Sequence, residues 1–193
     1  MRTIFYLLFA MGLFAQEYET QNYMILGRLD DAEVRFYPEV MKAKTEGSLS
    51  SNGNFSKLFN YIAKGNASST KIAMTTPVYM QQDSLRSQME FVLPRKYLTE
   101  MAPSPVRSDV VVYKARAGFF VALEFAGYNN ANKTAKYRRE LEKILESNNI
   151  SSQGPLKVLG YNSPLTLFNR RNEVLFEVQE ESLPQAFRDS KQD

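Results

Sequence analysis

The sequence repeats one pattern of elements, and this repeat limits the folds open to the chain. Two short amphipathic helices are predicted. In the first, residues 55–64, apolar side chains fall at i, i+3, i+4 and i+7, Asn54 stands where an N-cap is expected, and Gly65 ends the helix. The second covers residues 135–147, with Thr134 as its predicted cap. Each helix has two strand-like stretches before it and two after it.

The strand-like stretches alternate between apolar and polar residues or form short apolar runs. They cover residues 23–26, 33–45, 72–81 and 88–93 in the first half, and 109–115, 119–125, 156–161 and 173–178 in the second. Between the halves lies PRKYLTEMAPSPVRS, residues 94–108, whose three prolines interrupt regular structure. Two such units can share one sheet, with a helix over each apolar face. The predicted fold is therefore α+β: a distorted, mostly antiparallel β-barrel of two β-β-α-β-β repeats with two flanking helices.

The boundaries of this domain follow from the same pattern. One domain is expected over residues 23–178, because a chain of 193 residues can bury roughly 70% of its unfolded surface without disulfides. Residues 179–193 form a polar C-terminal tail. Two readings of this tail stay open: a loosely ordered segment, or one in which Leu183 and Phe187, spaced at i and i+4, dock on the domain.

The composition removes many kinds of chemistry. The chain has no cysteine, which excludes thiolate nucleophiles and cysteine metal sites, and no histidine, which excludes a Ser–His–Asp triad and the commonest ligand of haem iron. No phosphate-binding loop or activated serine is found, so no enzymatic activity is predicted. The net charge of +3 is small, and basic residues are scattered among acidic ones, so nucleic acid is not an expected partner.

The first fifteen residues, MRTIFYLLFAMGLFA, have the pattern of a secretory signal peptide. Arg2 precedes an apolar run that is too short to span a bilayer, and the small Ala15 precedes a polar stretch. We therefore predict a signal peptide at residues 1–15 and export to the periplasm or the medium. A buried N-terminal strand or helix is the alternative. No later stretch is apolar enough for an integral membrane segment.

The run KIAMTTPVYM, residues 71–80, is the most distinctive stretch of the chain. Its alternation favours a strand with Met74 filling the core, and Pro77 is expected at an edge or a bulge because it cannot donate a ladder hydrogen bond. A direct role of this run in ligand binding is the second interpretation.

KIAMTTPV resembles the run that marks the SOUL haem-binding family. Further pieces agree in order: VRFYPEV at 34–40, FNYIAKGN at 59–66, EFVLP at 90–94 and YNSPLTLFNRRNEVLFEV at 161–178. The resemblance implies a SOUL fold and non-covalent binding of haem or another tetrapyrrole. It places the ligand at the surface, between the first helix and the loop at residues 163–171. The cofactor-binding residues implied are apolar or aromatic (Phe55, Leu58, Phe59, Tyr61, Ile62) and basic (Lys57, Lys64, Arg170, Arg171).

Some members of this family have been discussed as binding haem iron through a histidine, and this chain has none. Tyrosine or methionine can ligate haem iron, and Tyr61, Tyr79, Met74 and Met80 are all present, with no spacing that selects among them. Binding through apolar contacts and paired propionates, without histidine ligation, is therefore the leading hypothesis. The helix stripe must chiefly pack on the sheet, so only residues at its rim, such as Lys57, Tyr61 or Lys64, are expected to be free for the ligand.

Two further hypotheses concern other residues. Arg170 or Arg171 pairing with Glu173 or Glu39 is favoured over a role in anion binding. Glu124, if it lines an enclosed cavity, would suit an effector-type domain for a cationic or lipid-like molecule, which is an alternative to an amphipathic tetrapyrrole. A protein-interaction module without a small ligand is the remaining alternative, and its protein partner is unknown from the sequence.

Overall fold

The computed structural model describes residues 18–48, 53–82, 86–163, 166 and 168–190, so the predicted signal peptide lies outside the described residues. In chain order the elements are β1 (Glu19–Thr20), β2 (Met24–Leu29), β3 (Ala32–Tyr37), β4 (Val40–Ser48), α1 (Gly53–Ala63), β5 (Thr75–Thr76), β6 (Val78–Gln82), β7 (Arg86–Val92), η1 (Arg95–Leu98), β8 (Val110–Ala115), β9 (Gly118–Ala126), α2 (Ala131–Ser147), β10 (Ser152–Gly160), β11 (Arg171–Val178), η2 (Glu180–Ser182) and α3 (Gln185–Asp189).

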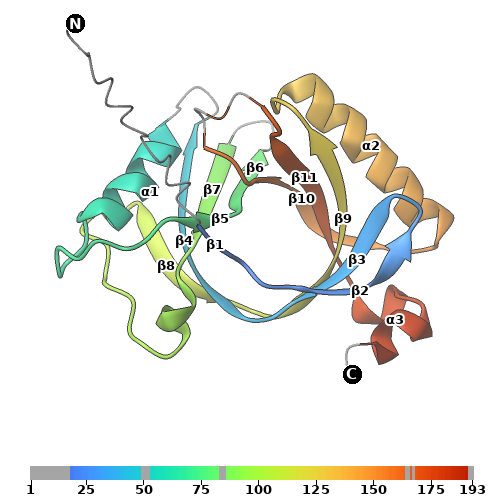
Figure 1. Ribbon diagram of the computed structural model, residues 1–193, viewed down its shortest axis with the longest axis horizontal. Helices are drawn as coiled ribbons and strands as arrows, with labels where there is room; N and C mark the ends of the chain where they lie inside the picture. The colour runs from blue at the N-terminus through green and yellow to red at the C-terminus, as the bar shows by residue number, and fades with distance from the viewer. Residues whose placement is uncertain (1–17, 49–52, 83–85, 164–165, 167, 191–193) are drawn as a thin grey trace, which may run out of the picture.

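Nine strands form one curled antiparallel sheet in the order β2-β3-β9-β11-β10-β6-β7-β4-β8 (Figure 1). The two repeats are β3-β4-α1-β6-β7 and β8-β9-α2-β10-β11, so β3, β4, β6 and β7 correspond to β8, β9, β10 and β11. The half-sheet β3-β9-β11-β10 therefore matches the half-sheet β8-β4-β7-β6, and a pseudo-twofold axis lies between β10 and β6. Each half of the sheet contains strands from both repeats. The predicted α+β fold class is confirmed, as a half-barrel with β2 and β8 at its edges.

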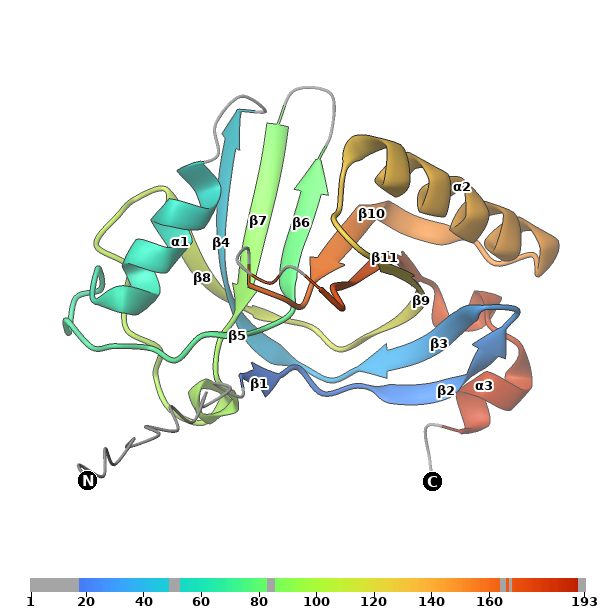
Figure 2. The ribbon, with the colours of Figure 1, turned by 45° about the horizontal axis from the view of Figure 1, so that its top comes forward.

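Both long helices pack on the outer face of this curl, at opposite ends of the sheet (Figures 1 and 2). Helix α1 covers β4 and β7, and α2 covers β9, β11 and β10. Side chains that point outward from the strands meet the helices in two apolar cores, one centred on Leu58 and Phe91 and the other on Leu141 and Val174. A third, smaller cluster lies on the inner face and includes Tyr79. The helices thus leave the inner face to polar and aromatic side chains.

Several predicted boundaries were wrong, and each has a local cause. The stretch 33–45 is two strands, interrupted at Pro38, which cannot donate a ladder hydrogen bond. The stretch 72–81 becomes strand only at Thr75, because Ile72 instead donates its N–H to the carbonyl of Ile62 and is buried beneath α1. Pro77 separates β5 from β6. Strand β5 pairs in parallel with β1, outside the main sheet.

The helix caps also differ from the prediction. Asn54 lies inside α1, and its side-chain amide donates to the carbonyl oxygen of Ser87 at 2.9 Å. Helix α2 begins a turn earlier than predicted, with Asn130 as its cap accepting from the N–H of Lys133 at 3.0 Å. Thr134 instead donates to the side chain of Asn129. The first turn of α2 contains no large apolar residue, so hydrophobic periodicity could not reveal it.

The C-terminal residues pack on the sheet, as one of the two readings of the tail expected. Leu183 is buried in the core beneath α2, and Phe187 of α3 packs against the same core. Gly27 on β2 allows this contact, because a Cβ there would fall 2.2 Å from the Phe187 ring. The segment after β11 therefore covers the β2 end of the half-barrel.

Candidate functional site

The inward stripe of α1 is part of the core. Leu58, Tyr61 and Ile62 are all buried against the sheet, and the Tyr61 hydroxyl donates to the carbonyl of Pro103 at 2.8 Å. Burial raises the pKa of Tyr61 to about 12, with a smaller contribution from Tyr97. These three residues from the implied haem site therefore hold the helix in place, and Tyr61 does not lie at a free rim.

One flank of α1 presents aromatic rings to the surface. Phe55 and Phe59 stack with ring centroids 5.8 Å apart and planes inclined by 15°. Phe55 meets Phe91 of β7 edge-on, at 5.4 Å. Phe59 remains 51% exposed. Because Phe55 is fixed by the core and Phe59 lies flat on it, the pair offers a preformed apolar surface.

The lysines predicted to accompany these rings lie elsewhere on the helix. At about 100° per residue, Lys57 is roughly 160° around α1 from Phe59. Its ammonium is 3.1 Å from Asp109, at the start of β8. Hydrogen bonds from Arg107, together with Lys57, hold the pKa of Asp109 well below its usual range. Lys64 is exposed just past the helix. Of the basic residues predicted on α1, Lys57 is already paired and lies on the flank facing away from Phe59.

Sequence reasoning did not single out Lys71, an exposed cation on the segment that returns along the end of α1. The chain turns back after α1, and Ile72 donates to the carbonyl of Ile62. Lys71 precedes this contact and is exposed. The segment then runs to β5, which contacts β7, the strand that Phe55 touches through Phe91. The helix end predicted at Gly65 was the sequence signal that the chain changes direction before Lys71.

The two arginines of the second implied segment have their own contacts. Arg171 lies on the inner face, with ion pairs to Glu124 at 2.9 Å and Glu173 at 2.6 Å. The predicted pairing with Glu173 is confirmed for Arg171. Arg170 donates to the carbonyl of Thr166 at 2.7 Å, and its guanidinium lies 4.5 Å from the ring centre of Tyr128. The contacts of Arg171 are thus on the opposite face of the sheet from α1.

The inner face carries two buried ion pairs, whose glutamates lie on the equivalent strands β11 and β7 and whose cations lie on β3 and β4. On β11, Glu173 accepts two hydrogen bonds from Arg35, at 2.8 and 3.0 Å, and one from Tyr161 at 2.8 Å. Burial raises the pKa of Glu173, but Arg35 and Tyr161 outweigh burial, so the net shift is downward. This pair neutralises both charges inside the half-barrel.

The second pair lies on β7 and β4. Glu90 accepts from Lys42 at 2.9 Å and from Tyr113 at 3.0 Å. The Lys42 ammonium lies 3.3 Å from the ring centre of Tyr79. Burial lowers the pKa of Lys42 to about 8, against the opposing effect of Glu90. Neither pair was identified from the sequence, although alternation along EVRFY places Glu33, Arg35 and Tyr37 on one face.

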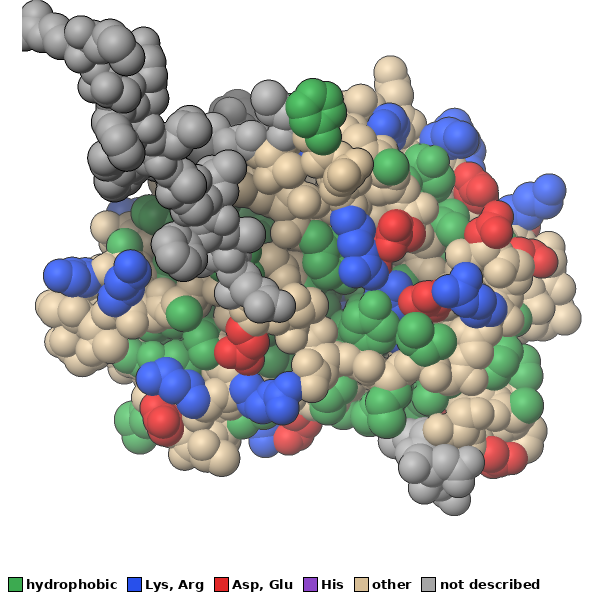
Figure 3. All heavy atoms as spheres, in the orientation of Figure 1, with side chains coloured by type: hydrophobic (Ala, Val, Ile, Leu, Met, Phe, Trp, Pro, Cys, Tyr) green, Lys and Arg blue, Asp and Glu red, His purple; other side chains and the backbone are tan. Residues whose placement is uncertain are grey.

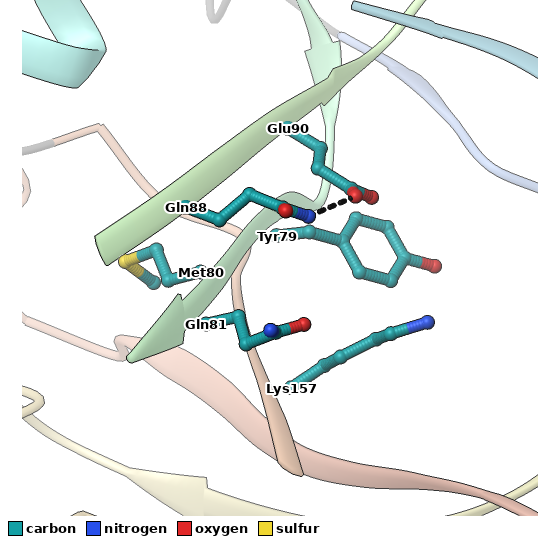
Figure 4. A pocket seen from close by; sticks show the side chains of 6 residues that line it. All are labelled: Tyr79, Met80, Gln81, Gln88, Glu90 and Lys157. Atoms are coloured by element: carbon teal, nitrogen blue, oxygen red, sulfur yellow. Dashed lines mark hydrogen bonds between the residues drawn. The ribbon is translucent and has the colours of Figure 1, made fainter. Parts of the chain in front are cut away.

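The space left on the inner face is small. Figure 4 shows a depression between β6, β7 and β10, where Gln88 donates to Glu90. It encloses essentially no volume, whereas usual ligand pockets enclose roughly 300–1,000 Å³. Glu124 lies outside it, mostly exposed and paired with Arg171. The condition for the effector-type alternative, Glu124 lining an enclosed cavity, is therefore not met in the described part of the chain.

The described residues also limit metal chemistry. No cluster of three acidic, histidine or cysteine side chains suited to a metal ion occurs among them. Of the candidate iron ligands, Tyr79 is buried and donates to Gln21 at 2.8 Å. Met74 and Met80 are partly buried against the two outer cores. The surface at Phe55 and Phe59 thus remains as the apolar element of the implied site.

No helix within the described ranges is long and apolar enough to cross a membrane.

A pseudo-symmetric antiparallel half-barrel with two outer helices is the SOUL or effector-binding-domain-like fold. A sequence model of the SOUL heme-binding protein family matches residues 18–177, and the chain belongs to that family. Human heme-binding protein 2 is 33% identical over 128 residues, and the mouse protein 31%. Each match covers 62% of this chain and 62% of the relative, which is less than two thirds of either relative's length.

Solved structures share the fold at low sequence identity. The C-terminal domain of EcmrR has a TM-score of 0.58 at 12% identity, over 81% of this chain and 98% of that domain. A hydrolase from Listeria innocua has a TM-score of 0.56 at 11% identity, over 77% of this chain and 92% of that chain. At these identities the likeness establishes the fold alone.

Proposed function

We propose that this chain is an exported, non-enzymatic protein that binds haem or a related tetrapyrrole non-covalently at its surface, without a histidine ligand. The observation that carries the proposal is the half-exposed ring of Phe59, which stacks on Phe55, while the ring of Phe55 packs against Phe91. A flat, rigid aromatic surface suits the face of a porphyrin, because both partners lose apolar area to water with little ordering cost. Family membership and the names of the relatives support this ligand class.

The charge of the ligand would be met by cations at the end of the helix. Haem carries two propionates at one edge of its ring. Lys71 and Lys64 are exposed on either side of the turn that follows α1, so a porphyrin on Phe59 would extend its propionates toward that turn. Lysines bind such groups as flexible point charges, which gives modest affinity. Arg170 and Arg171, with contacts of their own, would contribute less.

The iron would then have no strong protein ligand. The nearby tyrosine, Tyr61, is buried and hydrogen-bonded to Pro103, and its raised pKa opposes the tyrosinate form that iron prefers. The affinity for haem would therefore come from contacts with the porphyrin ring and its propionates, and not from a bond to the iron. Metal-free protoporphyrin should bind about as well as hemin.

The test compares variants in a hemin titration followed by Soret absorbance. Phe59→Ala should weaken binding about 5–30-fold, because a half-exposed phenylalanine contributes on the order of 1–2 kcal/mol when its ring is covered. Ile25→Ala on β2 is the matched control, since Ile25 is 53% exposed and lies at the far edge of the sheet. Equal affinities for both variants would refute the site.

Export is tested separately. The protein recovered from the periplasm or medium of its host should begin at Gln16 when its N-terminus is sequenced. Retention of Met1 on exported protein, or recovery only from the cytoplasm, would refute the signal-peptide part of the proposal and leave the haem site untouched.

A further inference from the structure

The connection between the two halves exposes three apolar side chains. Met101 is 95% exposed, Val106 72% and Leu98 39%. The connection itself is firmly attached, because Tyr97 of η1 is buried in the α1 core and Pro103 accepts a hydrogen bond from Tyr61. These side chains therefore protrude from a fixed base.

A second segment packs against this connection. The N–H of Ala67 donates to the carbonyl of Ser104 at 2.8 Å, and that of Val106 donates to Gly65 at 3.3 Å. Asn66 and Pro105 form a β-bridge. Residues 64–71 and 95–107 thus make one continuous surface at the α1 end of the molecule, called here the η1 surface (Figure 1).

The η1 surface is strongly basic. Its two segments contain five lysines and arginines and one acidic residue, Glu100, so their net charge exceeds the +3 of the whole chain. Arg107 is paired with Asp109, and Lys96 lies 3.5 Å from Glu100. Lys64, Lys71 and Arg95 are exposed and have no ion pair among the described side chains. Basic residues that are scattered along the sequence are therefore gathered by the fold.

We propose that the η1 surface docks on anionic lipid bilayers. Figure 3 shows, at the left and lower left, hydrophobic side chains interspersed with Lys and Arg and with a few acidic side chains over this end of the molecule. Protruding apolar side chains on two packed segments of net positive charge fit an interface in which methionine, valine and leucine enter the headgroup boundary and the cations meet lipid phosphates. A protein partner would need a groove shaped to receive these protruding side chains. A bilayer instead deforms around them, which suits the nearly fully exposed Met101. The protein would lie on the membrane, with α1 close to it.

The absence of tryptophan gives a direct reporter. Because the chain has no tryptophan, Met101→Trp introduces a single fluorophore at the exposed tip. Its emission should shift to shorter wavelength when equimolar phosphatidylglycerol–phosphatidylcholine vesicles are added, and should not shift with phosphatidylcholine alone. Ile25→Trp, on the β2 edge, is the control and should not respond. No shift of Met101→Trp, or equal shifts at both positions, would overturn the proposal.

Charge variants of the chain, measured by vesicle co-sedimentation, separate a docked surface from general attraction. The triple variant Lys64→Gln, Lys71→Gln, Arg95→Gln should lower partitioning by about fivefold per cation, or roughly a hundredfold in all. The matched control removes three exposed cations of α2, with Lys136→Gln, Arg139→Gln and Lys143→Gln. It should retain most of the binding. Equal losses in the two triple variants would overturn the proposal, as would capture only by an acidic protein and not by vesicles. Vesicle binding is measured without haem, so these outcomes do not depend on the haem proposal, although Lys64 and Lys71 take part in both.

Discussion

Removing Arg35 should destabilise the protein strongly, because it leaves a buried carboxylate without its main partner. Glu173 is fully buried and accepts two hydrogen bonds from Arg35. Breaking a buried ion pair from one side typically costs about 3–5 kcal/mol. Arg171 and Tyr161 remain beside Glu173, so we expect the lower end, about 3 kcal/mol for Arg35→Met. At this chain length that lowers Tm by roughly 6–12 °C.

The assay is a double-mutant cycle in urea, followed by circular dichroism. Adding Glu173→Gln to Arg35→Met removes the buried charge that has lost its main partner, so the double variant should recover about 2 kcal/mol relative to Arg35→Met. Arg171 keeps its ion pair with Glu124 in that background. Arg28→Met is the control, because the Arg28–Glu33 pair is exposed and should be worth less than about 1 kcal/mol. Single-variant effects that add within about 0.5 kcal/mol would refute a coupled pair.

Three other predictions concern stability. Burial lowers the pKa of Lys42 from 10.5 to about 8, so between these pH values the unfolded chain binds more protons than the folded protein. The free energy of unfolding in urea should therefore rise by about 2 kcal/mol from pH 8 to 9.5, and it should show no such rise in Lys42→Met. Gly27→Ala should cost about 1–3 kcal/mol by displacing Phe187, and adding Phe187→Ala should make the glycine substitution nearly neutral; additive effects would contradict this. Asn130→Ala should cost about 1 kcal/mol in thermal unfolding as the loss of a cap, whereas an equal loss for Thr134→Ala would contradict the cap assignment.

The order of elements was readable from the sequence because each helix and strand has one apolar face. Phe55, Leu58 and Ile62 revealed α1, and Leu141, Ile144 and Leu145 revealed α2. The family motif then pointed to the same fold. Boundaries set by single hydrogen bonds, such as the Asn130 cap, leave no periodic signal and were missed.

The site was only partly predictable. The periodicity of a helix in the sequence shows which residues form its apolar face, but not which side of that face stays exposed next to a neighbouring strand. Phe59 is exposed because Phe55 fills the space above Phe91, and Lys57 is occupied because Asp109 lies across from it. The pairs Arg35–Glu173 and Lys42–Glu90 join strands far apart in sequence, so only the strand order could reveal them.

The most direct test of the account is a parallel titration of the purified protein with hemin and with metal-free protoporphyrin, followed by Soret absorbance and tyrosine quenching. Binding that rests on the Phe55–Phe59 surface predicts saturable binding of both ligands with similar dissociation constants, and weaker binding of both by Phe59→Ala. Tight binding of hemin alone would contradict the account by showing that a protein side chain ligates the iron. Saturable binding of neither would remove the tetrapyrrole proposal and leave the fold and family as established.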